Sequence, residues 1–130
     1  MTLVQSRIVT HDVARLARFY EELTGVTPHG SDEYVEFRIT GGLAICSKRS
    51  ADLFNGRAAT PCANKSVILD FQVEDVDQER LRLLTFVNEF VLEPTDQPWG
   101  NRSMIFGDPD GNLINVFSVI QGVRKQRGCT

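Results

Sequence analysis

The feature that most constrains this sequence is a helix start signal that occurs twice. Asp12-Val13 and Asp75-Val76 each follow a short apolar segment and precede a segment with helical periodicity, 63 residues apart (75 − 12). Asp is a preferred N-cap residue because its carboxylate accepts hydrogen bonds from the unpaired N–H groups of the first helical turn. We therefore predict one α+β unit used twice, the alternative being two similar units that arose by chance.

The first copy is predicted to be a βαβββ unit. Residues 3–9 form a strand, a helix runs from the Asp12 cap to a stop at Gly25, and residues 34–39 and 43–47 form a hairpin around a double glycine. The helix carries one apolar stripe at helical spacing: Val13, Leu16, Ala17, Tyr20 and Leu23. Residues 49–62 are polar and contain Gly and Pro, so we predict a connector that could hold one short helical turn.

The second copy follows the same plan. Residues 67–73 are predicted to be a strand, Asp75 caps a second helix, and residues 90–93 form a further strand. Residues 103–106 and 113–119 form a hairpin around the DPDGN turn at 108–112. The second helical stripe consists of Val76, Leu83, Leu84 and Val87. We expect a single domain over residues 1–130, with modules at roughly 1–60 and 64–121 and a polar tail at 122–130.

Composition excludes several classes of protein. A net charge of −3 argues against a nucleic-acid binder, which normally presents a basic face. No apolar run approaches the roughly 18 to 20 residues that span a bilayer, so we expect no membrane partner. Three cysteines, Cys46, Cys62 and Cys129, without a CxxC spacing are typical of free thiols in a reducing compartment, and the polar N-terminal segment does not look like a secretory leader. We expect a cytoplasmic protein.

Two segments resemble a known family. DVARLARFYEELTG at 12–25 is similar to the pattern D-x-x-x-x-x-x-F-Y-x-x-x-L-G of vicinal-oxygen-chelate modules, except that Thr24 separates Leu23 from Gly25. PWGNRSMIFGDPDGNLINVFS at 98–118 resembles the more specific C-terminal signature W-G-x-R-x-x-x-F-x-D-P-D-G-N. The chain thus resembles the vicinal oxygen chelate (glyoxalase/bleomycin resistance protein/dioxygenase) superfamily. This resemblance implies an α+β fold of two tandem βαβββ modules whose curved mixed sheets surround a pocket, and often a homodimer.

The same resemblance indicates where metal ligands would lie. Members that use a metal place ligands on the first and last strands of each module, and the corresponding positions here are Gln5, Ala44, Ile68 and Asn115. Two of these positions have no donor atom and two are neutral amides, whereas a divalent ion requires several N or O donors. A one-residue slip at Ile68 offers only Val67 or Leu69. We therefore predict no metal ligand and no cofactor.

Strand alternation assigns other side chains to the implied pocket. If Gln5 faces it, so does Arg7, and Asp70 is the matching position in the second module. Arg7 and Asp70 either form a buried or half-buried structural ion pair with each other, or one of them contacts a ligand of opposite charge. Cys46 is either an inert buried thiol or a nucleophile. Trp99 either borders the pocket or has only a packing role within the fold. The predicted ligand-binding set is Gln5, Arg7, Cys46, Asp70, Trp99, Met104, Asn115 and Phe117.

These observations favour a metal-free, bleomycin-resistance-like protein that binds a small molecule, such as a cationic or aromatic drug or metabolite. The alternative is a glyoxalase-like lyase, isomerase or dioxygenase relative that uses Cys46, Arg7 and Asp70 or an unconventional metal. No catalytic residue is identified, because the sequence contains no Ser-His-Asp set, no acid–base carboxylate pair and no phosphate loop. A module that binds a partner chain has no sequence feature in its favour, and the natural ligand does not follow from the sequence.

Overall fold

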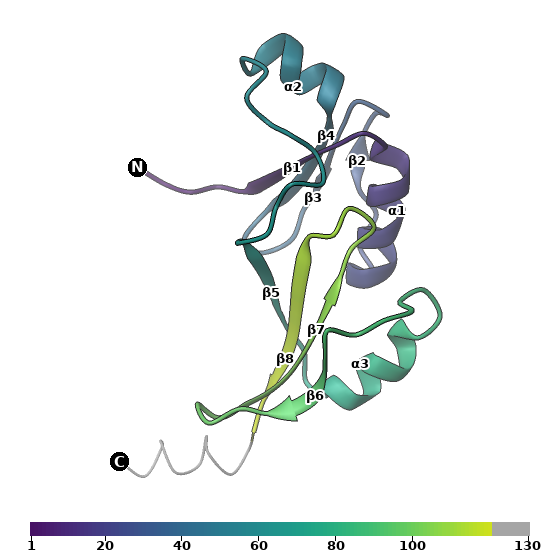
Figure 1. The fold of residues 1–130 in the computed structure, drawn as a ribbon, viewed down its shortest axis with the longest axis vertical. Coiled ribbons are helices and arrows are strands. Elements are labelled where there is room, and N and C mark those ends of the chain that lie inside the picture. Colours follow the sequence, from purple (N-terminus) through teal and green to yellow (C-terminus); the bar gives the residue numbers. More distant parts are fainter. Residues whose placement is uncertain (121–130) are drawn as a thin grey trace. The chain divides into compact units, whose positions relative to one another are not determined.

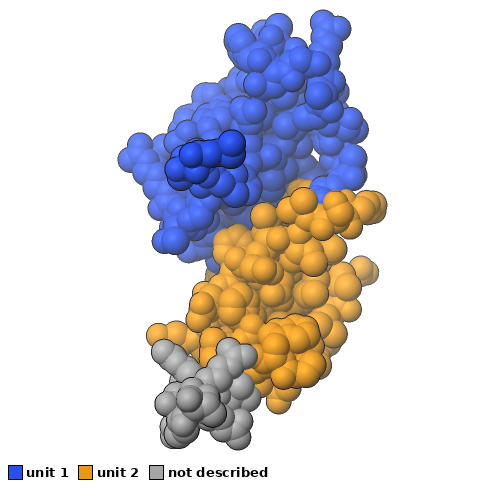
Figure 2. Space-filling model, turned by 90° about the vertical axis from the view of Figure 1, so that its left-hand side faces the viewer, with its two compact units in different colours: residues 1–64, 109–111 blue, residues 65–108, 112–130 orange. Residues whose placement is uncertain are grey.

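The computed structural model describes residues 1–120, which fall into two compact units (Figures 1 and 2). Unit 1 contains Met1–Asn64 with the short segment Pro109–Gly111, and unit 2 contains Lys65–Asp108 and the chain from Asn112 onward. The predicted polar tail at 122–130 lies outside the described residues. Within 1–120, no helix is both long and apolar enough to cross a membrane.

Unit 1 contains a four-stranded mixed sheet with the order β1-β4-β3-β2. Its strands are β1 (Ser6–Thr10), β2 (His29–Gly30), β3 (Tyr34–Phe37) and β4 (Leu43–Ser47). The β3–β4 hairpin is confirmed, and β1 runs parallel to β4. β1 begins later than predicted, because pairing starts where the Ser6 N–H donates to the Gly42 carbonyl (3.2 Å). The βαβββ plan requires three strands after the helix, and the two-residue strand β2 is the one to which no residues were assigned in the prediction.

Helix α1 (Val13–Thr24) matches its prediction. The Asp12 carboxylate accepts from the N–H of Arg15 at 3.1 Å, and Gly25 ends the helix in the left-handed region (φ 72°), where its N–H bonds to the Glu21 carbonyl. All five members of the predicted stripe are buried: Val13, Leu16, Ala17, Tyr20 and Leu23. The α1 helix therefore supplies one complete side of the unit 1 core.

Helix α2 (Lys48–Phe54) is longer than the single turn predicted for this connector. The Ser47 hydroxyl caps it by accepting from the Ser50 N–H (3.0 Å), and Lys48 pairs with Asp52 one turn later at 2.9 Å. Only Ala51 is buried in this helix. The helix therefore depends on its cap and ion pair rather than on an apolar stripe, which is why hydrophobic periodicity did not predict it.

Unit 2 repeats the topology of unit 1, with the order β5-β8-β7-β6 and β5 parallel to β8. Its strands are β5 (Ile68–Gln72), β6 (Leu92–Asp96), β7 (Asn101–Gly107) and β8 (Leu113–Val119). The last hairpin is confirmed, and β6 lies a few residues later than predicted. The α+β class and the two tandem modules are thus confirmed.

Helix α3 (Val76–Leu83) is shorter than α1. Its Asp75 cap accepts from two backbone N–H groups, those of Asp77 (3.1 Å) and Gln78 (3.2 Å). Leu84 was predicted to be part of the buried stripe, but its side chain is 47% exposed because the helix ends before it. Val87 is buried all the same, since a turn after the helix bonds its N–H to the Leu83 carbonyl (2.7 Å).

Each unit has its own core between its sheet and its helix (Figure 1). In unit 1 the largest fully buried side chains are Leu16, Tyr20, Phe37 and Ile45. In unit 2 they are Val76, Leu83, Met104, Phe106 and Ile114. Burial of these side chains supplies the main favourable free energy of folding.

Candidate functional site

The strand registers place equivalent residues of the two units in the same structural position. In unit 1 Arg7 of β1 pairs with Ala44 of β4, and in unit 2 Asp70 of β5 pairs with Asn115 of β8. Arg7 and Asp70 each lie five residues before a helix cap (12 − 7 and 75 − 70), at Asp12 and Asp75. The register therefore agrees with the equivalence inferred from the repeat.

The face of the unit 2 sheet that lies opposite to its core is the first candidate site. Alternation along the paired strands puts these residues on it: Ile68, Asp70, Gln72, Leu113, Asn115, Phe117, Ser103 and Ile105. The three β5 residues are exposed, and the three β8 residues are half-buried. Apolar side chains thus lie beside amides and a carboxylate, the mixture that is typical of small-molecule sites.

The centre of this face is the pair Asp70 and Asn115. The Asn115 Nδ2 amide donates to the Asp70 Oδ1 carboxylate oxygen at 3.1 Å. The Asn115 Oδ1 atom is buried and has no hydrogen-bond partner among the described residues. Such an unpaired buried acceptor is uncommon in folded proteins and costs free energy until a donor reaches it.

Met104 does not share a wall with Asn115 and Phe117, so that prediction is wrong. Met104 pairs with Val116 and is fully buried on the core side of the sheet. The residue opposite Phe117 is Ser103, which is 6% exposed and accepts from the Gln97 Nε2 amide at 3.2 Å. The prediction missed Ser103 because a one-residue error in hairpin register exchanges the two faces of a strand.

The corresponding face of unit 1 has different chemistry. Gln5 donates through Nε2 to the Tyr34 hydroxyl (3.1 Å), which donates in turn to the Glu36 Oε1 carboxylate oxygen (2.8 Å). Tyr34 and Glu36 lie opposite Cys46 and Ala44 in the ladder, so they share this face. Tyr34 and Glu36 were not predicted to belong to the site. Alternation puts the two on one face of the strand, but only the hairpin register shows that Ala44 shares this face.

Cys46 lies on the same face as Arg7 and Ala44, as predicted. Its side chain is 1% exposed, and burial raises the pKa of the thiol, while the nearby Arg7 charge lowers the pKa only in part. A buried thiol with a raised pKa stays protonated near neutral pH and is a poor nucleophile. This environment is the one expected for an inert cysteine.

Arg7 and Asp70 do not show the burial expected of a structural pair. Both residues are exposed, and Asp70 has its hydrogen-bond partner, Asn115, within its own unit. Arg7 and Asp70 belong to different units. Their pairing stays a prediction, and the expectation that they are buried or half-buried is wrong.

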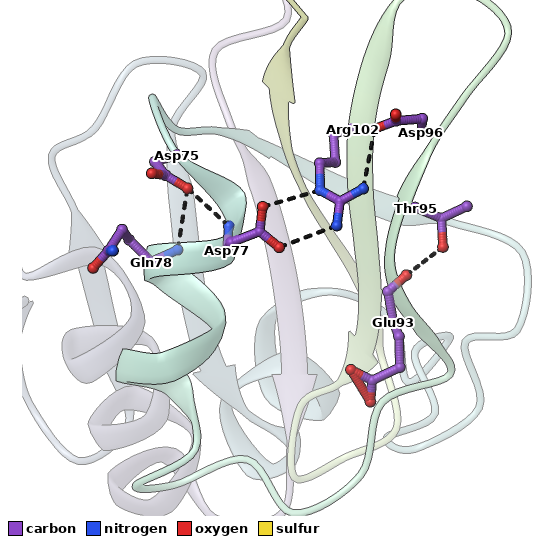
Figure 3. Close-up of polar contacts among 7 residues, drawn as sticks. All are labelled: Asp75, Asp77, Gln78, Glu93, Thr95, Asp96 and Arg102. Atoms are coloured by element: carbon purple, nitrogen blue, oxygen red, sulfur yellow. Dashed lines mark hydrogen bonds and ion pairs between the residues drawn. The ribbon is translucent and has the colours of Figure 1, made fainter.

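The W-G-x-R segment places its aromatic and its basic residue differently. Trp99 is 58% exposed in the turn between β6 and β7, whose shape uses the positive φ of Gly100 (97°). Figure 3 shows the Arg102 side chain pointing to the first turn of α3, where it binds both Asp77 oxygens (3.0 and 3.2 Å), and to Asp96 of β6 (3.1 Å). The hydrogen bonds to Asp77 and then to Asp96 raise the pKa of Arg102. Arg102 therefore joins the start of α3 to the β6–β7 hairpin.

The donor set at the four family positions does not fit a divalent ion. Ala44 and Ile68 have no donor atom, the Gln5 amide donates to Tyr34, and the Asn115 amide donates to Asp70. Divalent ions in proteins are held by three or more carboxylate, imidazole, thiolate or carbonyl donors. Across residues 1–120, no three His, Cys, Asp or Glu side chains are grouped as such a ligand set.

Comparison with known proteins identifies the fold. A crystal structure of a glyoxalase/bleomycin resistance protein/dioxygenase from Nocardioides has 24% sequence identity and a TM-score of 0.77, over 94% of this chain and 85% of that one. A glyoxalase/bleomycin resistance protein/dioxygenase family enzyme from Burkholderia phytofirmans PsJN has 16% identity and a TM-score of 0.80, over 92% of this chain and 100% of that one. A protein of unknown function from Agrobacterium tumefaciens str. C58 has 25% identity and a TM-score of 0.78, over 92% and 95%. A search of curated proteins found no match.

The family assignment rests on a match over most of the sequence. The model of the Glyoxalase/Bleomycin resistance protein/Dioxygenase superfamily matches residues 2–116, which include both helix caps and the complete W-G-x-R and DPDGN segments. The repeated strand order, the two Asp caps and this match agree with one another. The chain belongs to the glyoxalase/bleomycin resistance protein/dioxygenase superfamily.

Proposed function

We propose that this chain binds a small cationic or aromatic molecule without the help of a metal, in the manner of a bleomycin-resistance protein. The observation that carries the proposal is the open face of unit 2, where the Asp70 carboxylate and the Asn115 amide lie among apolar side chains. A binding site of this kind obtains affinity from apolar contact and orientation from a few polar groups. In this role the protein sequesters a drug or metabolite and leaves it chemically unchanged.

Phe117 is the apolar side chain most suited to such a ligand. It lies two residues from Asn115 on the same face of β8 and is half-buried, so part of its ring is available to a bound molecule. A cationic group gains additional attraction over an aromatic face. The proposal therefore places the aromatic part of the ligand against Phe117.

Metal-free binding is tested by titrating the purified protein, treated with EDTA and dialysed, against a panel of cationic and planar aromatic compounds by calorimetry. We expect saturable binding that added Zn²⁺, Mn²⁺ or Fe²⁺ does not strengthen. Phe117→Leu should weaken binding by about tenfold, since it removes the ring and keeps an apolar side chain. Glu89→Gln, which removes an exposed carboxylate in a loop, is the matched control and should bind like the natural protein. Binding that requires a metal, or no binding by any compound in the panel, would contradict the proposal.

The enzymatic alternative uses either Cys46, Arg7 and Asp70 or an unconventional metal, and no observation favours Cys46 as its nucleophile. Because burial raises its thiol pKa, Cys46 should react with a thiol reagent at pH 7 far more slowly than the exposed Cys62. Mass spectrometry of a Cys129→Ser variant after brief labelling measures the two rates separately. Faster labelling of Cys46 than of Cys62 would reopen the nucleophile hypothesis.

The proposal includes a homodimer that works in the cytoplasm. Family resemblance supports the dimer, and the thiols of Cys46 and Cys62 are compatible with a reducing compartment. Light scattering on the eluting protein should give twice the chain mass of 14.6 kDa. A mass equal to that of one chain at micromolar concentration would remove the dimer from the proposal.

A further inference from the structure

We propose that Asp70 and Asn115 together recognise the N–H groups of a protonated primary or secondary amine; this inference rests on the proposed ligand-binding function. The two residues are direct partners in the parallel β5–β8 ladder and are joined by the hydrogen bond from Asn115 Nδ2 to Asp70 Oδ1 (3.1 Å). That bond uses one amide donor and one carboxylate lone pair. The atoms that it leaves unused determine what the pair can bind.

Two acceptor atoms are left without a partner, beside the second N–H of the Asn115 amide. Asn115 Oδ1 is buried without a partner. Within the described residues the Asp70 carboxylate has no hydrogen bond or ion pair beyond the bond from Asn115. An ionised carboxylate has no proton to donate, and the Asn115 amide is oriented with its donor toward Asp70. Because Asn115 Oδ1 is buried, a ligand reaches it only when the Asn115 side chain or its neighbours move. A ligand group that then complements both atoms must carry at least two N–H donors and, opposite Asp70, a positive charge. A protonated amine meets both conditions, whereas a quaternary ammonium has no N–H and a carboxylate is repelled.

The neighbouring residues indicate the kind of molecule that carries the amine. Ile68 and Leu113 occupy the row before Asp70 and Asn115, Phe117 lies in the row after them, and Ile105 is the neighbour of Asn115 on β7. Side chains in adjacent rows on one face are about 7 Å apart, and directly opposed ones about 5 Å. An ammonium on a short chain bearing an aromatic ring spans this distance. We therefore infer an arylalkyl amine as the ligand class.

Among residues 1–120, this arrangement occurs in unit 2 and not in unit 1, although both units share the register. The matching positions in unit 1 are Arg7 and Ala44, a cation and a side chain without polar atoms. Arg7 would repel an ammonium, and Ala44 cannot accept a hydrogen bond. The inference therefore predicts one amine site for each chain.

The test uses two probes of the same shape, 2-phenylethylamine and its N,N,N-trimethyl derivative, titrated at pH 7 in metal-free, low-salt buffer. Backbone NMR shifts of the natural protein report both affinity and location. We expect the amine to bind at least about tenfold more tightly than the trimethyl derivative, with shifts centred on residues 68–72 and 113–117. Equal affinity for the two probes, shifts elsewhere, or no saturable binding of the amine would overturn the inference.

Variants separate recognition from folding. Asp70→Asn removes the charge and keeps the shape, and Asn115→Leu removes the unpaired acceptor; each should weaken amine binding by about tenfold or more. Neutral 2-phenylethanol should bind Asp70→Asn and the natural protein equally, which shows that the face remains folded. Glu89→Gln controls for the loss of one negative charge. Unchanged amine affinity in Asp70→Asn would contradict the inference.

The two proposals fail in different ways. If cationic and planar compounds bind the metal-free protein but the amine has no advantage over its trimethyl derivative, amine recognition is wrong and the proposed function stands. If no compound of the wider panel binds, the proposed function itself is wrong.

Discussion

The two units use the same strand order and the same kind of helix cap, yet their helices contribute differently to their cores. Helix α1 has 12 residues and five buried side chains, whereas α3 has 8 residues and only Val76 and Leu83 buried. The two sheets contribute alike, each with four buried core-facing residues: Val35, Phe37, Leu43 and Ile45 in unit 1, and Met104, Phe106, Ile114 and Val116 in unit 2. A repeated topology therefore does not require repeated packing.

The sheet faces that lie opposite to the two cores differ more than the cores do. At equivalent ladder positions unit 1 has Arg7 and Ala44, and unit 2 has Asp70 and Asn115. Ala44 is fully buried, whereas Asn115 is half-buried and hydrogen-bonds to an exposed carboxylate. Backbone pairing specifies where these side chains lie but not their chemistry. We therefore expect ligand recognition in unit 2, at a position whose counterpart in unit 1 has the opposite charge.

The largest effects are expected from truncating one core leucine in each helix. Leu16→Ala in α1 and Leu83→Ala in α3 both affect fully buried side chains, so each should lower the free energy of unfolding by about 2 to 5 kcal/mol. Leu81→Ala, at a position of α3 that is 61% exposed, is the control and should change it by less than about 0.5 kcal/mol. Urea unfolding measures all three. If Leu83→Ala were as mild as the control, the short stripe of α3 would not be part of the core.

Smaller losses in the free energy of unfolding are expected from removing the two helix caps. Asp12→Ala removes one side-chain hydrogen bond to the backbone and Asp75→Ala removes two, so each should cost about 1 kcal/mol, with Asp75→Ala the more harmful. Thermal unfolding of both variants gives the comparison, and Asp32→Ala in an exposed loop serves as the reference. A greater loss for Asp12→Ala would mean that the longer helix depends more on its cap than the hydrogen bonds indicate.

The smallest effect on stability is expected from the ion pair between Arg80 of α3 and Glu93 of β6. The hydrogen bond from Arg80 holds the pKa of Glu93 below its ordinary value of 4.5. A carboxyl whose pKa is lowered by folding stabilises the native state above its unfolded pKa, and this contribution is lost as the pH falls through the folded pKa. NMR titration should show Glu93 titrating below 4.5, and Arg80→Met should return it toward that value. An unchanged Glu93 titration in Arg80→Met would show that the pair does not form in solution.

Much of the fold was predictable from local signals. Asp12, Gly25 and Asp75 mark helix ends because caps satisfy the unpaired backbone groups of the nearest turn. The apolar stripe of α1 and the last hairpin followed from periodicity and from the DPDGN turn. Strand alternation also placed Arg7 and Cys46 on one face and Asp70 on the side of β5 away from the helix, although the exposure of Asp70 was not predicted. Helix α2 was underestimated because its cap and ion pair have no periodic signature.

The sequence by itself determined the family, the two-module plan and the position of each module's equivalent residues, because these depend on spacing along the chain. Tertiary structure alone decided that Met104 lies on the core face while Ser103 lies on the opposite face beside Phe117, since hairpin register is a cross-strand property and a shift of one residue exchanges the faces. It also decided that Asn115 turns its donor to Asp70 and leaves a buried acceptor unpaired. Orientation of a side-chain amide depends on which partner lies across the ladder, and no spacing rule encodes it.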